Sequence, residues 1–142
     1  MERNRIAMID ADGTQTEHDG QSDLHSKECR VALTQMVMRL FDLWKLPSSD
    51  QAALLNRSLG TIRRYRSGGC FRIDEEMYDR VGSLLVIHKN LRILYPYNLD
   101  LVYRWVSARN QAFDGQPPIE IMKQGLYGLR RVWRYLEYLL QY

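Results

Sequence analysis

Apolar residues recur every three or four positions from about Cys29 to the end of this chain, and this spacing restricts the fold to packed helices. No stretch alternates apolar and polar residues for long enough to predict a sheet. With 142 residues, the chain has room for one ordinary domain or for two very small ones that share a core. We therefore predict an all-α fold.

Local signals divide the first part of this region into three short helices. Ser48 and Gln51 have the spacing of a capping box at the start of the second helix. Asn56 tolerates the left-handed backbone that a tight turn needs, and Ser58 can cap the third helix, which Gly68 ends. Three helices thus fall within about forty residues, a layout compatible with a helix-turn-helix.

The second part is predicted to hold a longer fourth helix and three further ones. Asp74 precedes two glutamates at the start of the fourth helix, and Asn98 can cap the fifth. Pro118 suits the first turn of a short helix that Gly125 ends, and the last helix runs from about Leu126 to the C-terminus. We therefore divide the chain into residues 1–27, 28–73 and 74–142.

Charge is unevenly distributed along the chain. Residues 1–28 hold seven acidic residues against three basic ones, and their scarcity of apolar residues predicts a flexible acidic tail over residues 1–27. In contrast, residues 51–73 hold five arginines and no carboxylate. Such a basic stretch favours a polyanion as partner, although a solvated arginine face would have the same composition.

The segment from Leu54 to Gly68, LLNRSLGTIRRYRSG, has the layout of a helix-turn-helix whose second helix exposes arginines. Arginine suits both the guanine edge and phosphate oxygens. Two features depart from the usual pattern: Arg57 stands where an apolar residue is common, and Gly60 costs a helix roughly 1 kcal/mol relative to alanine. A pair of helices that only packs therefore remains an alternative. The predicted DNA-binding residues are Arg57, Ser58, Thr61, Arg63, Arg64 and Arg66.

Catalytic and metal-binding patterns are missing from the sequence. Two of the three histidines, His18 and His25, lie in the acidic segment, and His88 lies beside an apolar helix stripe. Cys29 and Cys70 show no spacing typical of a zinc site, and we expect two reduced thiols. There is no glycine-rich phosphate loop, signal peptide or membrane-length apolar run. We expect a cytoplasmic protein with no enzymatic activity, metal or cofactor.

The run WVSARNQAFDGQPPIEIMKQG, from Trp105 to Gly125, resembles the toxin-binding domain of Xre/MbcA/ParS-type antitoxins. The resemblance extends over about residues 31–140, including the Xre-like helix-turn-helix. One departure is Arg109, where the family often has proline. The resemblance implies an antitoxin that neutralises a RES-domain toxin, an enzyme that consumes NAD, and that represses its own operon at an operator DNA. It also implies that the C-terminal region blocks the cleft of the toxin.

The aromatic residues fit a binding surface in this part of the chain. Seven of the nine tyrosines lie beyond residue 94, and Tyr, Trp and Arg are the types that most often anchor interfaces. About half of these rings could instead belong to the core, beginning with Trp105 and Trp133. The predicted toxin-binding residues are Asn110, Phe113, Arg131, Arg134, Tyr135, Tyr138 and Tyr142.

Two further functions remain open at this stage. The chain could be a stand-alone transcription factor whose C-terminal helices only dimerise, or an interaction protein whose helix-turn-helix no longer binds DNA. Helix-turn-helix regulators usually present two recognition helices to DNA, so we expect a homodimer built partly on the fourth helix. A neighbouring gene for a RES-domain protein would favour the antitoxin.

Overall fold

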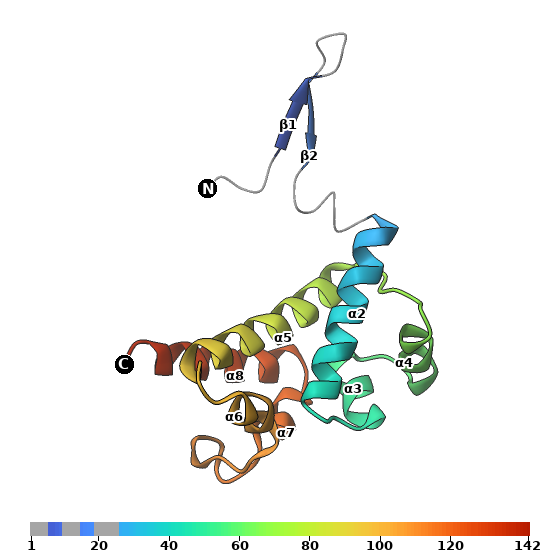
Figure 1. The fold of residues 1–142 in the computed structure, drawn as a ribbon. Helices are drawn as coiled ribbons and strands as arrows, with labels where there is room; N and C mark the ends of the chain where they lie inside the picture. Colours follow the sequence, from blue (N-terminus) through green and yellow to red (C-terminus); the bar gives the residue numbers. More distant parts are fainter. Residues whose placement is uncertain (1–5, 10–14, 19–25) are drawn as a thin grey trace.

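The computed structural model describes residues 6–9, 15–18 and 26–142, and the last of these ranges is helical (Figure 1). In chain order its helices are α2 (Lys27–Leu43), α3 (Ser48–Leu55), α4 (Leu59–Arg66), α5 (Glu75–Leu94), α6 (Leu99–Arg104), the 3-10 turns η1 (Trp105–Ser107) and η2 (Gln111–Phe113), α7 (Pro118–Met122) and α8 (Leu126–Leu140). The predicted all-α class is confirmed for this body.

Two short strands, which we did not expect, precede the helices. Strand β1 (Ile6–Ile9) pairs antiparallel with β2 (Gln15–His18), and Ile6 faces His18 across the pair. The other residues of the predicted acidic tail, apart from the start of α2, lie outside the described part of the chain. The flexible tail therefore stays a prediction.

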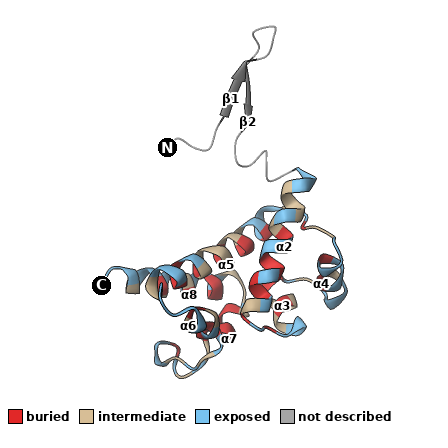
Figure 2. Ribbon diagram, in the orientation of Figure 1, coloured by how far each residue is buried: buried red, intermediate tan, exposed pale blue. Residues whose placement is uncertain are grey.

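Helix α5 is the centre of the body. It packs along α8 and also contacts α3 and α6, whereas α7 packs against α8. Helix α4 and the C-terminus lie on opposite sides of the molecule (Figure 1). Buried side chains form one continuous hydrophobic cluster that extends from α2 to α8 (Figure 2). The two predicted helical segments, 28–73 and 74–142, thus share a core.

The predicted helix caps at Ser58 and Asn98 are present, because their side chains accept hydrogen bonds from the Thr61 and Leu101 amides at 3.1 Å each. Asp74, which was expected at the start of α5 for its charge, also caps that helix and accepts from the Met77 amide at 2.8 Å. Asn56 has φ 55° and ψ 50°, the left-handed conformation expected of it.

The predicted capping box at Ser48 is wrong. Ser48 is already the first residue of α3, and the cap position is held by Pro47, which has no side-chain hydrogen bond. Gln51 is buried, and its amide group donates to the Leu46 carbonyl at 2.9 Å. Its side-chain oxygen accepts from Arg66 at 2.9 Å, so tertiary partners occupy the group that a capping box would need.

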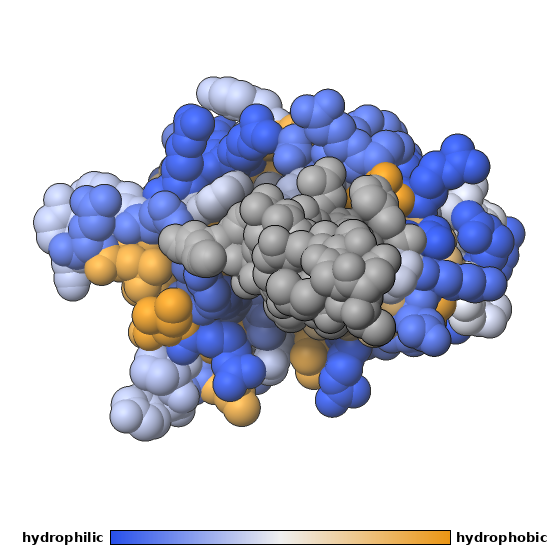
Figure 3. Space-filling model, turned by 90° about the horizontal axis from the view of Figure 1, so that it is seen from above, coloured by the Kyte–Doolittle hydropathy of each residue, from blue (hydrophilic) through white to orange (hydrophobic). Residues whose placement is uncertain are grey.

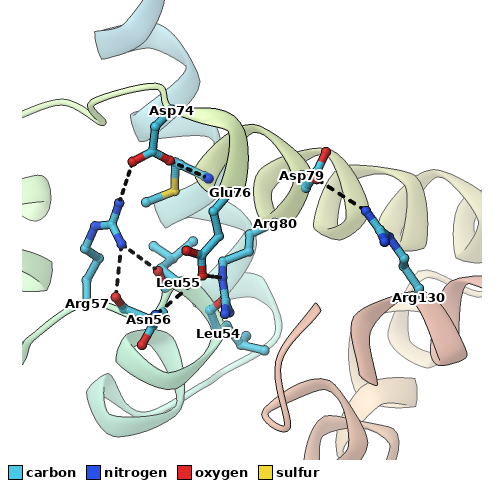
Figure 4. A network of polar contacts seen from close by, with 10 residues as sticks. Leu54, Leu55, Asn56, Arg57, Asp74, Glu76, Asp79, Arg80 and Arg130 are labelled. Carbon is cyan, nitrogen blue, oxygen red and sulfur yellow. Dashed lines mark hydrogen bonds and ion pairs between the residues drawn. The ribbon is translucent and has the colours of Figure 1, made fainter. Parts of the chain in front are cut away.

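Polar side chains link the helices at several places (Figure 4). Arg80 of α5 is buried, donates to the Leu54 carbonyl at 2.9 Å and pairs with Glu76 at 2.8 Å, which lowers the pKa of Glu76. Arg130 of α8 pairs with Asp79 of α5 at 3.3 Å. These contacts fix the position of α5 relative to its neighbours.

A second link joins two residues that lie 73 positions apart in the sequence. Lys123, which follows α7, pairs with Asp50 of α3 at 3.0 Å and with Glu120 at 3.2 Å. The hydrogen bond to Asp50 is the main reason that the pKa of Lys123 is raised. Helix α3 is therefore attached to the helix pair α7 and α8.

The surface seen from above is mostly hydrophilic, with hydrophobic side chains in small separate groups (Figure 3). Within the described residues, no helix combines the length and the apolar character needed to cross a membrane.

Candidate functional site

Helices α3 and α4 are joined by a three-residue turn, and they lie in the segment for which the sequence predicts a helix-turn-helix. Asn56 begins the turn in the left-handed conformation, and Ser58 ends it as the cap of α4. Ile62 and Tyr65 are buried and fix α4 to the core. The opposite face of α4, which includes Gly60, Arg63 and Arg64, is exposed.

The six predicted DNA-binding residues fall into two groups. Arg63 and Arg64 are exposed, and no carboxylate pairs with either among the described residues. Arg64 lies over the ring of Tyr65, with its guanidinium carbon 5.2 Å from the ring centre. Thr61 is half-buried beside them, and its hydroxyl lies 3.0 Å from that of Ser58.

Arg57 and Arg66 are engaged within the fold. Arg57 donates to the Asn56 carbonyl at 3.0 Å and lies 3.8 Å from Asp74, so it closes the interhelical turn (Figure 4). Arg66 pairs with Asp42 at 2.9 Å. The sequence could not reveal these partners, because Asp42 lies 24 positions away.

A hollow of about 470 Å³ lies beside the exposed face of α4. We call it the arginine hollow, because four of its lining residues are arginines. Its lining consists of Arg30, Arg57, Thr61, Arg64, Tyr65, Cys70, Arg72 and Asp74. Two of these arginines, Arg30 on α2 and Arg72 after α4, were not among the predicted sites. Arg72 could have been found from the basic stretch, whereas no local signal pointed to Arg30.

A second surface is formed by aromatic rings near the C-terminus. We call it the aromatic row, and it consists of Trp105, Phe113, Tyr135, Tyr138 and Tyr142. Neighbouring ring centres lie 5.1–6.4 Å apart. Trp105 and Phe113 are buried, whereas Tyr138 is 53% and Tyr142 87% exposed. The row therefore leads from the core to the surface.

Arginines border the exposed part of the row. The guanidinium of Arg131 lies 5.4 Å from the ring centre of Phe113. Arg134 is exposed and lines a hollow of about 300 Å³ together with Arg130, Trp133 and Glu137. Trp133 is half-buried and donates to Glu137 at 2.9 Å. This face of α8 is thus both basic and aromatic.

Asn110 and Phe113 shape the loop that supports the row. The side chain of Asn110 accepts from the Ala112 amide at 2.9 Å, and its carbonyl accepts from Phe113 and Gly115 at 3.0 Å each. Asp114 and Gly115 follow with φ values of 58° and 83°, so the turn needs residues that tolerate left-handed backbone. Phe113 is then placed against Tyr135.

Tyr127 is one of the seven C-terminal tyrosines, but it was not among the predicted toxin-binding residues. It is 77% exposed, and it precedes Arg131 and Tyr135 by four and eight positions on α8. Residues with this spacing share one helix face, so Tyr127 extends the basic and aromatic face toward the start of α8.

No grouping of metal-binding residues is found in the part of the chain that the structure describes. In those residues, no cluster of three or more His, Cys, Asp and Glu side chains could hold a metal ion. His88 is half-buried and stacks on Tyr103, with 3.4 Å between its Nε2 and the tyrosine oxygen. Burial and the nearby Arg92 lower the pKa of His88.

Comparison with known proteins adds one match. Residues 90–140 match the family model described as the antitoxin Xre/MbcA/ParS C-terminal toxin-binding domain. The matched segment includes the whole aromatic row except Tyr142, and it begins within α5, after α3 and α4. No curated protein matches the chain.

Proposed function

We propose that this protein is an antitoxin that neutralises a RES-domain, NAD-consuming toxin and represses its own operon, because residues 90–140 match the model of the Xre/MbcA/ParS C-terminal toxin-binding domain. It acts by binding and catalyses nothing. It works in the cytoplasm as a homodimer within a larger complex, with the toxin and operator DNA as partners.

The observation that carries this proposal is the exposed end of the aromatic row, which begins at Tyr138 inside the matched segment and continues to Tyr142 just after it. A group of neighbouring exposed rings is typical of an interface, because burying aromatic side chains against a partner contributes favourable binding free energy. Tyr138 on α8 and Tyr142, two residues after its end, are exposed, and so are Arg131 and Arg134 of α8, which gives the surface the residue types of interface anchors. We assign toxin contact to this face, and we assign Asn110 and Phe113 the role of supporting it.

We expect Tyr138→Ala combined with Tyr142→Ala to weaken toxin binding by at least about 30-fold, because anchor residues contribute about 2 kcal/mol or more. The chain should still fold, since both rings are largely exposed. Calorimetric titration with the product of the neighbouring toxin gene measures the loss. Point changes are preferable to truncation before Tyr135, which would also remove the fully buried Leu136.

Tyr97 provides a matched control. It is a tyrosine with 99% exposure, but it lies before α6 and outside the row. Tyr97→Ala should bind the toxin like the unmodified chain. Equal binding by the double variant would show that the row is not the contact surface, and failure of the unmodified chain to bind any RES-domain neighbour would overturn the antitoxin proposal.

The DNA-binding part of the proposal is supported by the exposed face of α4. Gly60 lies in this face, and a Cβ atom added there would meet no heavy atom of the chain closer than 3.8 Å. The fold therefore does not need a glycine at a helix position where glycine is costly. Close approach of an external molecule, here duplex DNA, accounts for the glycine at position 60.

A stand-alone helix-turn-helix transcription factor is the second candidate. It is favoured by the boundary of the family match, which leaves α2, α3 and α4 outside the toxin-binding segment. Under this function the chain would bind its promoter and no toxin would co-purify with it.

A further inference from the structure

We propose that the arginine hollow binds a phosphate group of the DNA backbone and thereby positions α4 in the groove. The inference rests on the proposed DNA-binding function and deepens it, because it assigns two arginines outside the helix-turn-helix segment to the contact. These are Arg30 from the first turn of α2 and Arg72 from the segment between α4 and α5.

The charge of the hollow selects an anion. Four guanidinium groups line it, and the one carboxylate among the lining residues, Asp74, lies 3.8 Å from Arg57 and also caps α5. Arg64 and Arg72 have no carboxylate partner among the described residues. Guanidinium groups bind phosphate oxygens through paired N–H donors, so this arrangement suits one phosphate group.

Arg30 is held at the rim by the chain itself. Its Nη1 donates to the Phe71 carbonyl at 3.3 Å and lies 3.9 Å from the Cys70 sulfur. Its Nε is buried and has no hydrogen-bond partner among the described residues. A buried donor without an acceptor is costly, so the fold gives up hydrogen-bond energy to hold the Arg30 guanidinium at the hollow.

The surroundings favour a DNA phosphate over a free nucleotide. A nucleotide site would need an exposed ring or an apolar slot to hold the base. The only ring in the lining is Tyr65, which is 2% exposed, covered by Arg64 and packed edge-on against Phe71 at 4.9 Å. Arg64 belongs both to the hollow and to the exposed face of α4. A phosphate bound in the hollow therefore lies directly beside the face of α4 that would contact the bases.

Salt titration of operator binding tests this assignment. Each phosphate charge neutralised contributes about 0.9 to the slope of log K against log salt concentration. Arg72→Gln should therefore reduce the slope by about 0.9 and weaken binding by roughly tenfold, and it should do so equally for operator and for unrelated DNA. Arg30→Gln should act in the same direction, and Arg30→Lys should retain the slope but lose part of the affinity.

Two comparisons make the outcome decisive. Arg92→Gln removes the same charge from an exposed position in the last turn of α5, outside the hollow, and should leave the slope unchanged. Because Arg72 has no partner within the described residues, Arg72→Gln tests the proposal even if Arg30→Gln loosens the fold. Unchanged slopes for Arg72→Gln would overturn the phosphate site, whereas an unmodified chain that binds no DNA would overturn the proposed DNA-binding function.

Discussion

Replacing Gly128 with alanine should force α7 and α8 apart and lower the free energy of unfolding by about 3 kcal/mol, the upper end of what overpacking usually costs. A Cβ atom at Gly128 would lie 1.9 Å from the Ile121 carbonyl oxygen and 2.9 Å from its carbonyl carbon. Both atoms belong to the backbone, so no side-chain rotation relieves the overlap. Thermal unfolding should record a drop in Tm on the order of 10 °C.

Gly82 provides the control for this prediction. It also lies within a helix, but a Cβ atom there would meet nothing within 4 Å. Gly82→Ala should leave the protein as stable as before or stabilise it by up to about 1 kcal/mol. If the Gly128→Ala and Gly82→Ala variants had the same Tm, the close packing of α7 on α8 would be wrong.

Replacing both Arg63 and Arg64 with alanine should weaken operator binding by about 100-fold or more, because a well-placed arginine fork contributes about 1–3 kcal/mol of base recognition. The salt dependence should also flatten, since two positive charges leave the contact. Stability should change little, because neither arginine pairs with a carboxylate in the described residues. A mobility-shift titration at several salt concentrations measures both effects.

Gly60→Ala tests the same surface by adding atoms. A Cβ atom there would make only ordinary van der Waals contacts, at 3.8 and 3.9 Å, so the variant should be as stable as the original or more so, yet bind operator DNA less tightly. If the Arg63 and Arg64 double variant bound operator DNA with unchanged affinity and an unchanged salt slope, another helix would have to face the DNA.

The sequence predicted the helices well where their signals are local. Ser58, Asp74 and Asn98 each accept a hydrogen bond from an amide three positions later, and such contacts depend on neighbouring residues alone. The capping box predicted at Ser48 and Gln51 is wrong because residues distant in the sequence decide the partners of Gln51. Gln51 is occupied by Arg66 and by the Leu46 carbonyl, and only the folded chain brings Arg66 to it.

The candidate surfaces could be predicted only in part for the same reason. Helical spacing is enough to place Tyr135 and Tyr138 on one side of α8, but it cannot tell that Phe113, from the segment before α7, packs against Tyr135. Equally, the arginines of the basic stretch are visible in the sequence, whereas Arg30 joins them from 41 positions before Phe71, whose carbonyl it contacts.

The shared core has a consequence for how long the protein survives in a cell. Because buried side chains from α2 to α8 form one cluster, the helical body should unfold in a single cooperative step. A partner that binds only the folded form, at either surface, then raises the stability of every helix by mass action. Losing that partner makes every helix of the body more susceptible to proteolysis at once. The degradation rate of the protein would therefore depend on whether a partner is bound at either surface.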